Sequence, residues 1–126
     1  MAYLVVVEDD TDSSDLLRRF LEHQGFEVDC MAGGQSAIDA VKERQPDLVI
    51  VDLCMPNMDG VRLLEHLRST FGMQALPAVV LTGLTDGPLL EKAHQLSRTS
   101  VLTKGRAMPQ DIIAAVHLSL QPVMGN

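Results

Sequence analysis

Six polar side chains stand directly after short apolar runs of this chain, and their types together suit phosphoryl chemistry. Four are acids, one carries a hydroxyl and one an amine: Glu8, Asp9, Asp10, Asp52, Thr82 and Lys104. A carboxylate can act as a nucleophile and carry a phosphoryl group as an acyl phosphate. That transfer needs a divalent cation, a further cation on the phosphoryl oxygens and a hydroxyl donor. The sequence therefore holds the parts of such a site, provided that the fold brings these residues together.

The acidic pair Glu8 and Asp9 predicts a metal site. If residues 3–7 and 48–51 form neighbouring strands, Asp52 lies beside this pair, and carboxylates that close resist simultaneous ionisation. A hard divalent cation relieves the repulsion, and an all-oxygen carboxylate site with room for water suits Mg²⁺. We therefore assign Glu8 and Asp9 to magnesium, at a site that faces Asp52.

The acids that follow this pair have an alternative role at the start of a helix. Acidic side chains near a helix N-terminus cap free amides and interact favourably with the helix dipole. We assign Asp12 and Asp15 to such a start. Asp10 stays open between a helix cap and a metal ligand.

Asp52 is the candidate nucleophile, with Lys104 as the cation and Thr82 as the hydroxyl donor. Each residue also has an ordinary interpretation, because the segment around Asp52 is rich in turn formers, a lysine is usually solvated, and a threonine suits a strand end. A carboxylate that ends a doubly buried strand opposite an acidic pair is costly unless it is used. Their joint placement at one sheet edge favours the phosphoryl-transfer interpretation.

The hydropathy pattern predicts an α/β fold in which five strands alternate with five helices. The strands are expected at residues 3–7, 26–31, 48–51, 78–81 and 100–103, and the helices at residues 12–24, 34–44, 60–70, 87–97 and 109–120. Repeated alternation implies parallel strands joined by right-handed crossovers. The second and fifth strands are the weaker candidates and are placed at the edges, which gives the order 2-1-3-4-5 of a flavodoxin-like, doubly wound (βα)5 sheet. Such sheets bind ligands at the carboxyl ends of strands one and three.

The first expected helix is amphipathic. It places Leu16, Leu17, Phe20 and Leu21 on one apolar face, as expected of a helix that packs against a sheet. Gly25 can end this helix in a left-handed C-cap.

Length, charge and cysteine content restrict the class of protein. The chain has 126 residues with 17 acidic and 10 basic side chains, a formal net charge of −7 and a sequence pI near 4.8. The length fits one domain, expected at residues 1–122 with a tail at 123–126. An acidic surface argues against direct binding to nucleic acid. Two cysteines, Cys30 and Cys54, with no signal peptide or long apolar segment, predict a cytoplasmic protein without a membrane span.

Four segments give the chain a resemblance to the receiver domain of two-component response regulators over essentially its whole length. They are VVVEDD at residues 5–10, PDLVIVDLCMPNMDG at 46–60, AVVLTG at 78–83 and VLTKG at 101–105. The second segment is the most specific, because it combines Asp52 with Pro56, Asp59 and Gly60 in a fixed register. The resemblance therefore points to the same residues as the chemistry does.

The resemblance implies a phosphorelay role. Asp52 would accept a phosphoryl group from a histidine kinase or phosphotransfer protein, and this would switch binding to a downstream output protein or domain. Asp9 and Asp52 would ligate Mg²⁺ directly, with the backbone carbonyl of Cys54 as a third ligand, and Glu8 would act through a metal-bound water. Such a domain is a signalling module and not an enzyme, expected as a monomer or weak dimer.

The resemblance also implies that Thr82 and Lys104 contact the phosphoryl group, and the chain departs from the family pattern beside both. Val101 stands where a Tyr or Phe usually reorients on activation, Gly105 stands where a cis proline usually follows the lysine, and Gly83 replaces the usual alanine. We expect a trans or more mobile loop after Lys104, and altered signal output with the acceptor chemistry intact.

Two further side chains lie close to the expected acceptor. Cys54 is two residues past Asp52, and it is expected to be inert because no second cysteine or histidine is evident beside it. Leu84 is two residues past Thr82, and its apolar bulk near the phosphoryl group predicts slow self-dephosphorylation.

Two other functions remain as alternatives. A pseudo-receiver would keep the fold and work without phosphorylation, which Val101 and Gly105 favour. A Mg²⁺-dependent phosphatase of the haloacid dehalogenase type also forms an aspartyl phosphate. Those enzymes place a second Asp two residues after the nucleophile, where this chain has Cys54.

Overall fold

A single sheet of five parallel strands forms the centre of the molecule in the computed structural model, which describes residues 1–121. The strands are β1 (Tyr3–Val7), β2 (Glu27–Met31), β3 (Leu48–Val51), β4 (Ala78–Thr82) and β5 (Thr99–Thr103). The helices are α1 (Thr11–His23), α2 (Gly34–Glu43), α3 (Gly60–Thr70), α4 (Pro88–Gln95) and α5 (Pro109–Leu120). The strand order is β2-β1-β3-β4-β5, so the predicted fold class and topology are confirmed.

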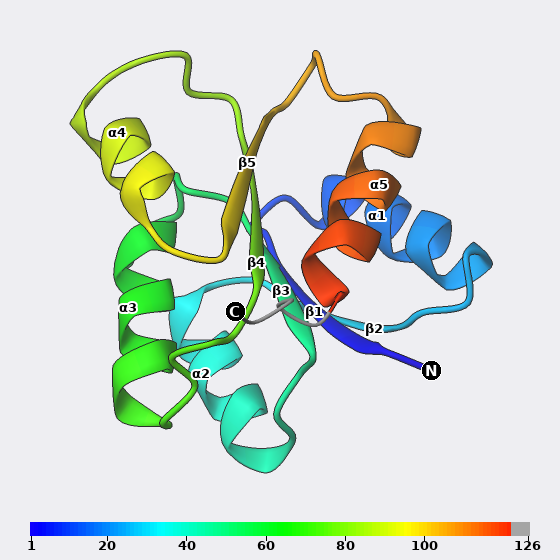
Figure 1. The fold of residues 1–126 in the computed structure, drawn as a ribbon, viewed down its shortest axis with the longest axis horizontal. Helices are drawn as coiled ribbons and strands as arrows, with labels where there is room; N and C mark the ends of the chain where they lie inside the picture. The colour runs from blue at the N-terminus through cyan, green and yellow to red at the C-terminus, as the bar shows by residue number, and fades with distance from the viewer. Residues whose placement is uncertain (122–126) are drawn as a thin grey trace.

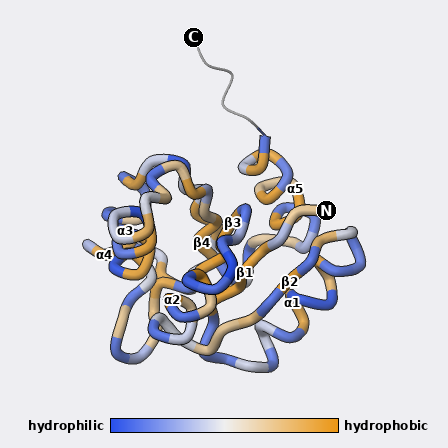
Figure 2. Tube along the Cα trace, turned by 90° about the horizontal axis from the view of Figure 1, so that it is seen from below, coloured by the Kyte–Doolittle hydropathy of each residue, from blue (hydrophilic) through white to orange (hydrophobic). Residues whose placement is uncertain are grey.

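The helices cover both faces of the sheet, with α1 and α5 on one face and α2, α3 and α4 on the other (Figure 1). Alternate residues of β1 divide between two hydrophobic cores. Val5 and Val7 belong to the core beneath α2, α3 and α4, whereas Leu4 and Val6 belong to the core beneath α1 and α5. Every residue of β1 and β3 is buried, and Figure 2 shows apolar residues along these central strands. Burial on both faces explains why these strands are continuous apolar runs.

The boundaries of the elements differ from the predicted ones by at most two residues. Helix α4 ends at Gln95, two residues before its predicted end, and β5 begins at Thr99, one residue before its predicted start. Hydropathy alone does not define the last turn of a helix, because terminal residues face solvent on most sides. The tail expected at residues 123–126 lies outside the described residues. Within residues 1–121, no helix is long and apolar enough to cross a membrane.

Helix α1 ends as its sequence predicts, but its apolar face is only partly covered. Gly25 follows the helix with φ +95°, the left-handed conformation that favours glycine. Leu21 is fully buried, and Leu17 and Phe20 are half-buried. Leu16 lines the same cavity as Leu17 and Phe20 and so shares their face as predicted, but its side chain is 72% exposed. The physical reason is a cavity between α1 and α5, which leaves this end of the face uncovered.

A polar cluster at the β1–β2 edge of the sheet surrounds the single tyrosine of the chain. The Tyr3 hydroxyl donates to Asp29 Oδ2 at 2.8 Å, and the Arg44 guanidinium carbon lies 3.8 Å from the centre of the Tyr3 ring. Arg44 also donates two hydrogen bonds to the Glu27 carboxylate, at 2.5 and 2.8 Å. Burial and the Asp29 carboxylate raise the pKa of Tyr3 from 10.0 to about 12. The cluster therefore ties the end of α2 to edge strand β2.

Tyr3 should ionise near pH 12 in the folded protein and near pH 10 in the unfolded chain. The chain contains one Tyr and no Trp, so ultraviolet absorbance of the phenolate against pH reports this group alone. Because the folded pKa is raised, the stability that Tyr3 contributes is complete below about pH 10 and is lost as the pH rises toward 12. Asp29→Asn should lower the folded pKa of Tyr3 toward 10, and an ordinary pKa of Tyr3 in the unmutated protein would contradict its burial and its hydrogen bond to Asp29.

Candidate functional site

Three residues that directly follow strands continue the hydrogen-bond ladder of the sheet. The backbone amides of Glu8, Asp52 and Lys104 donate to the carbonyls of Met31, Val7 and Thr82, over 3.0, 3.1 and 2.7 Å respectively. Val7 is paired with Val51 across β1 and β3, so the acids that follow these two strands are neighbours. The sheet therefore holds the three side chains at its carboxyl edge, where the topology predicts a ligand site.

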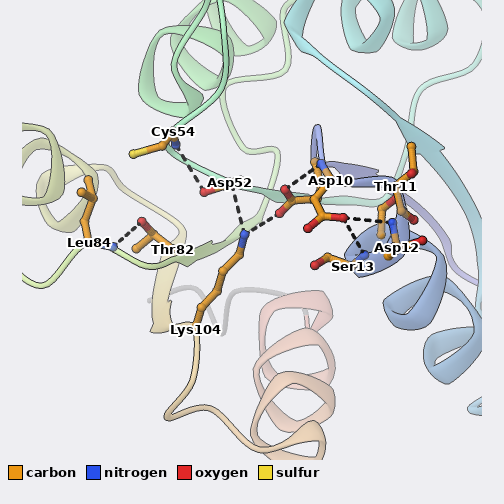
Figure 3. Close-up of polar contacts among 11 residues, drawn as sticks. Asp10, Thr11, Asp12, Ser13, Asp52, Cys54, Thr82, Leu84 and Lys104 are labelled. Atoms are coloured by element: carbon orange, nitrogen blue, oxygen red, sulfur yellow. Dashed lines mark hydrogen bonds and ion pairs between the residues drawn. The ribbon is translucent and has the colours of Figure 1, made fainter.

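The Lys104 ammonium bridges two acids of the site (Figure 3). Its Nζ lies 2.6 Å from Glu8 Oε2 and 3.1 Å from Asp52 Oδ2. Glu8 is only 7% exposed and Asp52 only 8%. A buried carboxylate without a partner is costly, and the ammonium offsets part of that cost for both acids. Lys104 is therefore the cation that holds this acidic pair together.

Three carboxylates of the site lie close enough to share one metal ion. Glu8, Asp9 and Asp52 each offer an oxygen, and these oxygens lie within 4.8 Å of one another. Asp9 is exposed and the other two residues are buried, so the cluster is open to solvent on one side. Hard oxygen donors with access for water fit Mg²⁺. One ammonium does not balance three carboxylates, and the remaining negative charge suits a divalent cation.

Burial and charge have opposite effects on the pKa values of Glu8 and Lys104. For Glu8, burial dominates and raises the pKa above its usual range, against the lowering effect of hydrogen bonds from Lys104 and the Asp10 amide. For Lys104, burial lowers the pKa, but the hydrogen bonds to Glu8 and Asp52 together outweigh it and the net shift is upward. Lys104 is consequently charged at neutral pH.

Asp10 caps helix α1, which settles the role that the sequence leaves open. Its Oδ1 accepts hydrogen bonds from the amides of Asp12 and Ser13 at 3.0 and 3.3 Å. Its own amide donates to Glu8 Oε1 at 3.1 Å, so the start of α1 is linked to the acidic cluster (Figure 3). Asp12 lies in the first turn as predicted, whereas Asp15 lies further along and pairs with arginines of the same helix.

The loop after β3 folds back tightly against Asp52, and a glycine permits this. A Cβ atom at Gly60 would lie 2.5 Å from the Asp52 carbonyl oxygen and 2.8 Å from Val51 Cγ1. Asp59, the residue before it, caps α3 by accepting an amide hydrogen bond from the first turn. Gly60 is therefore required by a close approach of two backbone segments, a reason that the motif alone does not reveal.

Thr82 lies at the same sheet edge, where its hydroxyl oxygen accepts an amide hydrogen bond from the following loop. Thr82 is fully buried, and its Oγ1 accepts a hydrogen bond from the Leu84 amide at 3.1 Å. Among the contacts of residues 1–121, this hydroxyl has no hydrogen bond to Asp52 or Lys104. Asp52 Oδ1 accepts instead from the Cys54 amide at 3.3 Å (Figure 3). The contact of Thr82 with a phosphoryl group therefore stays a prediction, because it depends on a rotamer that sequence does not encode.

Comparison with known families shows which family the chain belongs to. Residues 4–117 match the response regulator receiver domain. The chain belongs to the receiver domain family. The matched range includes all the residues of the site, from Glu8 to Lys104, so the family resemblance inferred from the sequence is confirmed.

Similar curated proteins are longer regulators. The DNA-binding response regulator MtrA of Mycolicibacterium paratuberculosis is 37% identical over 83 residues, which is 66% of this chain and 36% of MtrA. The phosphate regulon transcriptional regulatory protein PhoB of Rhizobium meliloti is 42% identical over 79 residues, which is 63% of this chain and 35% of PhoB. The chain therefore spans little more than a third of the length of these relatives.

Solved structures agree with the fold. The signal receiver domain of a signal transduction histidine kinase from Syntrophus aciditrophicus has a TM-score of 0.88 and 25% identity, covering 100% of this chain and 95% of that one. The chemotaxis protein CheY4 of Vibrio cholerae has a TM-score of 0.85 and 23% identity, covering 94% and 98%. The second likeness concerns the fold alone.

The receiver domain departs from the family pattern on the β5 side of the site. Val101 is half-buried in β5 and packs against the core beneath α2, α3 and α4, without an aromatic ring. The Lys104–Gly105 peptide bond is trans, one of the two states expected for this loop, and Gly105 has φ +85°. A side chain other than glycine rarely adopts that conformation, so the loop after Lys104 depends on Gly105.

The structure places two adjacent acids in different surroundings, Asp10 at the cap of α1 and Asp9 in the acidic cluster, and paired variants can test whether their roles differ. Asp10→Ala should lower the free energy of unfolding by about 1 kcal/mol, because it removes the cap of α1. It should leave divalent-cation affinity nearly unchanged. Asp9→Ala should leave the free energy of unfolding without Mg²⁺ nearly unchanged and weaken Mg²⁺ binding by at least about tenfold. Urea unfolding with and without Mg²⁺ measures both effects, and equal Mg²⁺ stabilisation of the Asp9 variant and the unmutated protein would contradict the assignment.

Proposed function

We infer that this receiver domain accepts a phosphoryl group on Asp52 in a Mg²⁺-dependent reaction. The observation that carries the proposal is a buried carboxylate that contacts an ammonium group and lies within 4.8 Å of two further acids. A carboxylate can attack phosphorus as a nucleophile, and the charges beside this one can hold a phosphoryl group. The membership of the receiver domain family supports the same conclusion.

Magnesium would be held by the three acids and the loop that follows β3. Asp9 and Asp52 would be direct ligands, Glu8 would act through a water, and the Cys54 carbonyl would complete the protein ligands. When bound, the ion supplies positive charge that offsets repulsion between the attacking carboxylate and the phosphoryl oxygens. The exposed side of the cluster at Asp9 supports entry of a hydrated ion.

The transfer itself exchanges one bond to phosphorus for another. An oxygen of Asp52 forms the new P–O bond as the P–N bond to the donor's imidazole breaks. The imidazole keeps the bonding electron pair and takes up a proton. Lys104 contacts Asp52 Oδ2 already, so its ammonium needs little movement to pair with a phosphoryl oxygen instead. The Thr82 hydroxyl only accepts from the Leu84 amide, so its own O–H would be able to donate to another phosphoryl oxygen.

The partners follow from this role. The donor would be a histidine kinase or a phosphotransfer protein, and the receptor of the signal would be an output protein or domain. MtrA and PhoB are described as a DNA-binding and a transcriptional regulator, which supports a transcriptional output for a protein with this receiver domain. We propose a cytoplasmic signalling module that catalyses no reaction beyond its own phosphorylation and dephosphorylation.

A pseudo-receiver that works without phosphorylation is the second candidate. Val101 and Gly105 stand where the family usually has the aromatic residue and the proline that take part in signal output.

The phosphatase alternative has less support. Cys54 is exposed and occupies the position where that enzyme class has its acidic second Asp. A thiol there would be a poor general acid for an alcohol leaving group.

Intact-mass spectrometry after incubation with Mg²⁺ and acetyl phosphate tests the proposal. We expect one added phosphoryl group that is absent without Mg²⁺ and absent in Asp52→Asn. Asp59→Asn is the matched control, because it neutralises a nearby acid while keeping a side chain that caps α3, and it should still be phosphorylated. No adduct in the unmutated protein would favour the pseudo-receiver, and repeated turnover of phosphate esters would favour the phosphatase.

Leu84 should lengthen the lifetime of the phosphorylated state. It is half-buried against the core beside the buried Thr82, and an apolar side chain there excludes attacking water. Leu84→Ala should therefore shorten the half-life, by roughly tenfold if about 1.4 kcal/mol of the barrier is lost. The decay of the mass adduct after removal of the donor gives the rate. A half-life of seconds in the unmutated protein, or no change in the variant, would count against this role.

A further inference from the structure

A cavity of about 430 Å³ opens between α1 and α5, beside the acidic cluster. We call it the α1–α5 cavity. Val6, Ile50 and Leu81 of the sheet form its floor, and Leu17 and Phe20 of α1 form one wall. This volume lies in the range of pockets that bind small molecules, roughly 300–1,000 Å³. Its lining is mainly apolar, with polar groups gathered at one end.

Small residues and an incomplete helix contact explain why the cavity exists. On the α5 side, the loop after Lys104 lines it with Gly105 and Ala107, which are too small to fill the space. On the α1 side, Leu17 and Phe20 are only half-buried, and Leu16 at the rim is 72% exposed. Apolar surface left uncovered in a concave site favours an apolar occupant over water.

The polar end of the cavity is negatively charged. Glu8, Asp52 and Lys104 line it, and Asp9 completes the acidic cluster within 4.8 Å. Lys104 is paired with both buried acids, so in the absence of Mg²⁺ it has little capacity left for an anion. Without Mg²⁺, this net negative charge repels an anionic head group and attracts an ammonium. Shape and charge together therefore select an apolar body with a cationic end.

We propose that the α1–α5 cavity binds a small organic ammonium ion, with its apolar body against Ile50, Leu81 and Phe20 and its ammonium at Glu8 and Asp52. Such a ligand places its positive charge among the same carboxylates that suit a divalent cation. Ligand and metal therefore weaken each other's binding, which gives the receiver domain an input independent of a kinase. The binding does not require phosphorylation of Asp52, and it stands if the proposed transfer fails.

Three probes with the same apolar body and different heads test the charge preference. They are 4-phenylbutylamine, 4-phenylbutan-1-ol and 4-phenylbutanoate, titrated without Mg²⁺ into the ¹⁵N-labelled protein and followed by amide chemical shifts. The amine should bind about tenfold tighter than the alcohol, because its head forms charge-assisted hydrogen bonds, and the carboxylate should bind weakest. Saturating Mg²⁺ should weaken the amine and leave the alcohol unchanged.

The location is tested by filling the cavity. Ala107→Leu places a larger side chain in it and should abolish binding of the amine. Ala114→Leu is the matched control, since it makes the same change at an exposed position of α5 and should bind like the unmutated protein. Circular dichroism checks that both variants fold. If Ala107→Leu does not fold, the amides of the unmutated protein that shift on adding the amine locate the binding site. They should lie in α1, at the end of β4 and in the loop after Lys104.

Several results would overturn the proposal. They are an equal or tighter affinity for the carboxylate, shifts centred away from the cavity, unchanged binding in a folded Ala107→Leu protein, and an absence of saturable binding. None of these readouts depends on acetyl phosphate, so failure here is distinguishable from failure of Asp52 to accept a phosphoryl group.

Discussion

Repulsion between like charges at the carboxyl edge of the sheet is the constraint on which the surroundings of Asp52 depend. Two buried carboxylates and one exposed carboxylate lie with oxygens within 4.8 Å of one another. In water such a group would spread apart, but here the backbone ladder holds its members in place. The Lys104 ammonium and two backbone amides donate hydrogen bonds to the buried acids and lower the free-energy cost of burying these carboxylates. The remaining imbalance of charge is what makes the site receptive to a cation.

Rigid and loosely packed parts of the domain meet at this edge. On one side, β1 and β3 are wholly buried, and the close approach of Gly60 to the Asp52 carbonyl leaves no space for a side chain at position 60. On the other side, α1 and α5 leave a cavity that reaches the same acids. The acids are therefore held precisely by the sheet while the space next to them stays accessible, an arrangement that keeps geometry and access separate.

The parts of the fold that sequence predicts are those where one physical term dominates. Doubly buried strands need continuous apolar runs, so β1, β3 and β4 and their order are predictable, and with them the edge where Asp52 and Lys104 lie. Contacts that depend on competing side-chain rotamers cannot be predicted from the sequence in this way. Thr82 bonds the Leu84 amide, and Lys104 pairs with two acids at once. The exposure of Leu16 also escapes prediction, because periodicity defines an apolar face but not how far another helix covers it.

The backbone conformation of Gly105 restricts which residues can follow Lys104. Its φ of +85° lies far from the value near −65° that the proline ring imposes. Proline at position 105 cannot adopt this conformation, so a mutation of Gly105 to proline would require the loop to change its conformation. A chain with this loop can therefore carry the lysine–proline pair only together with compensating changes in the loop.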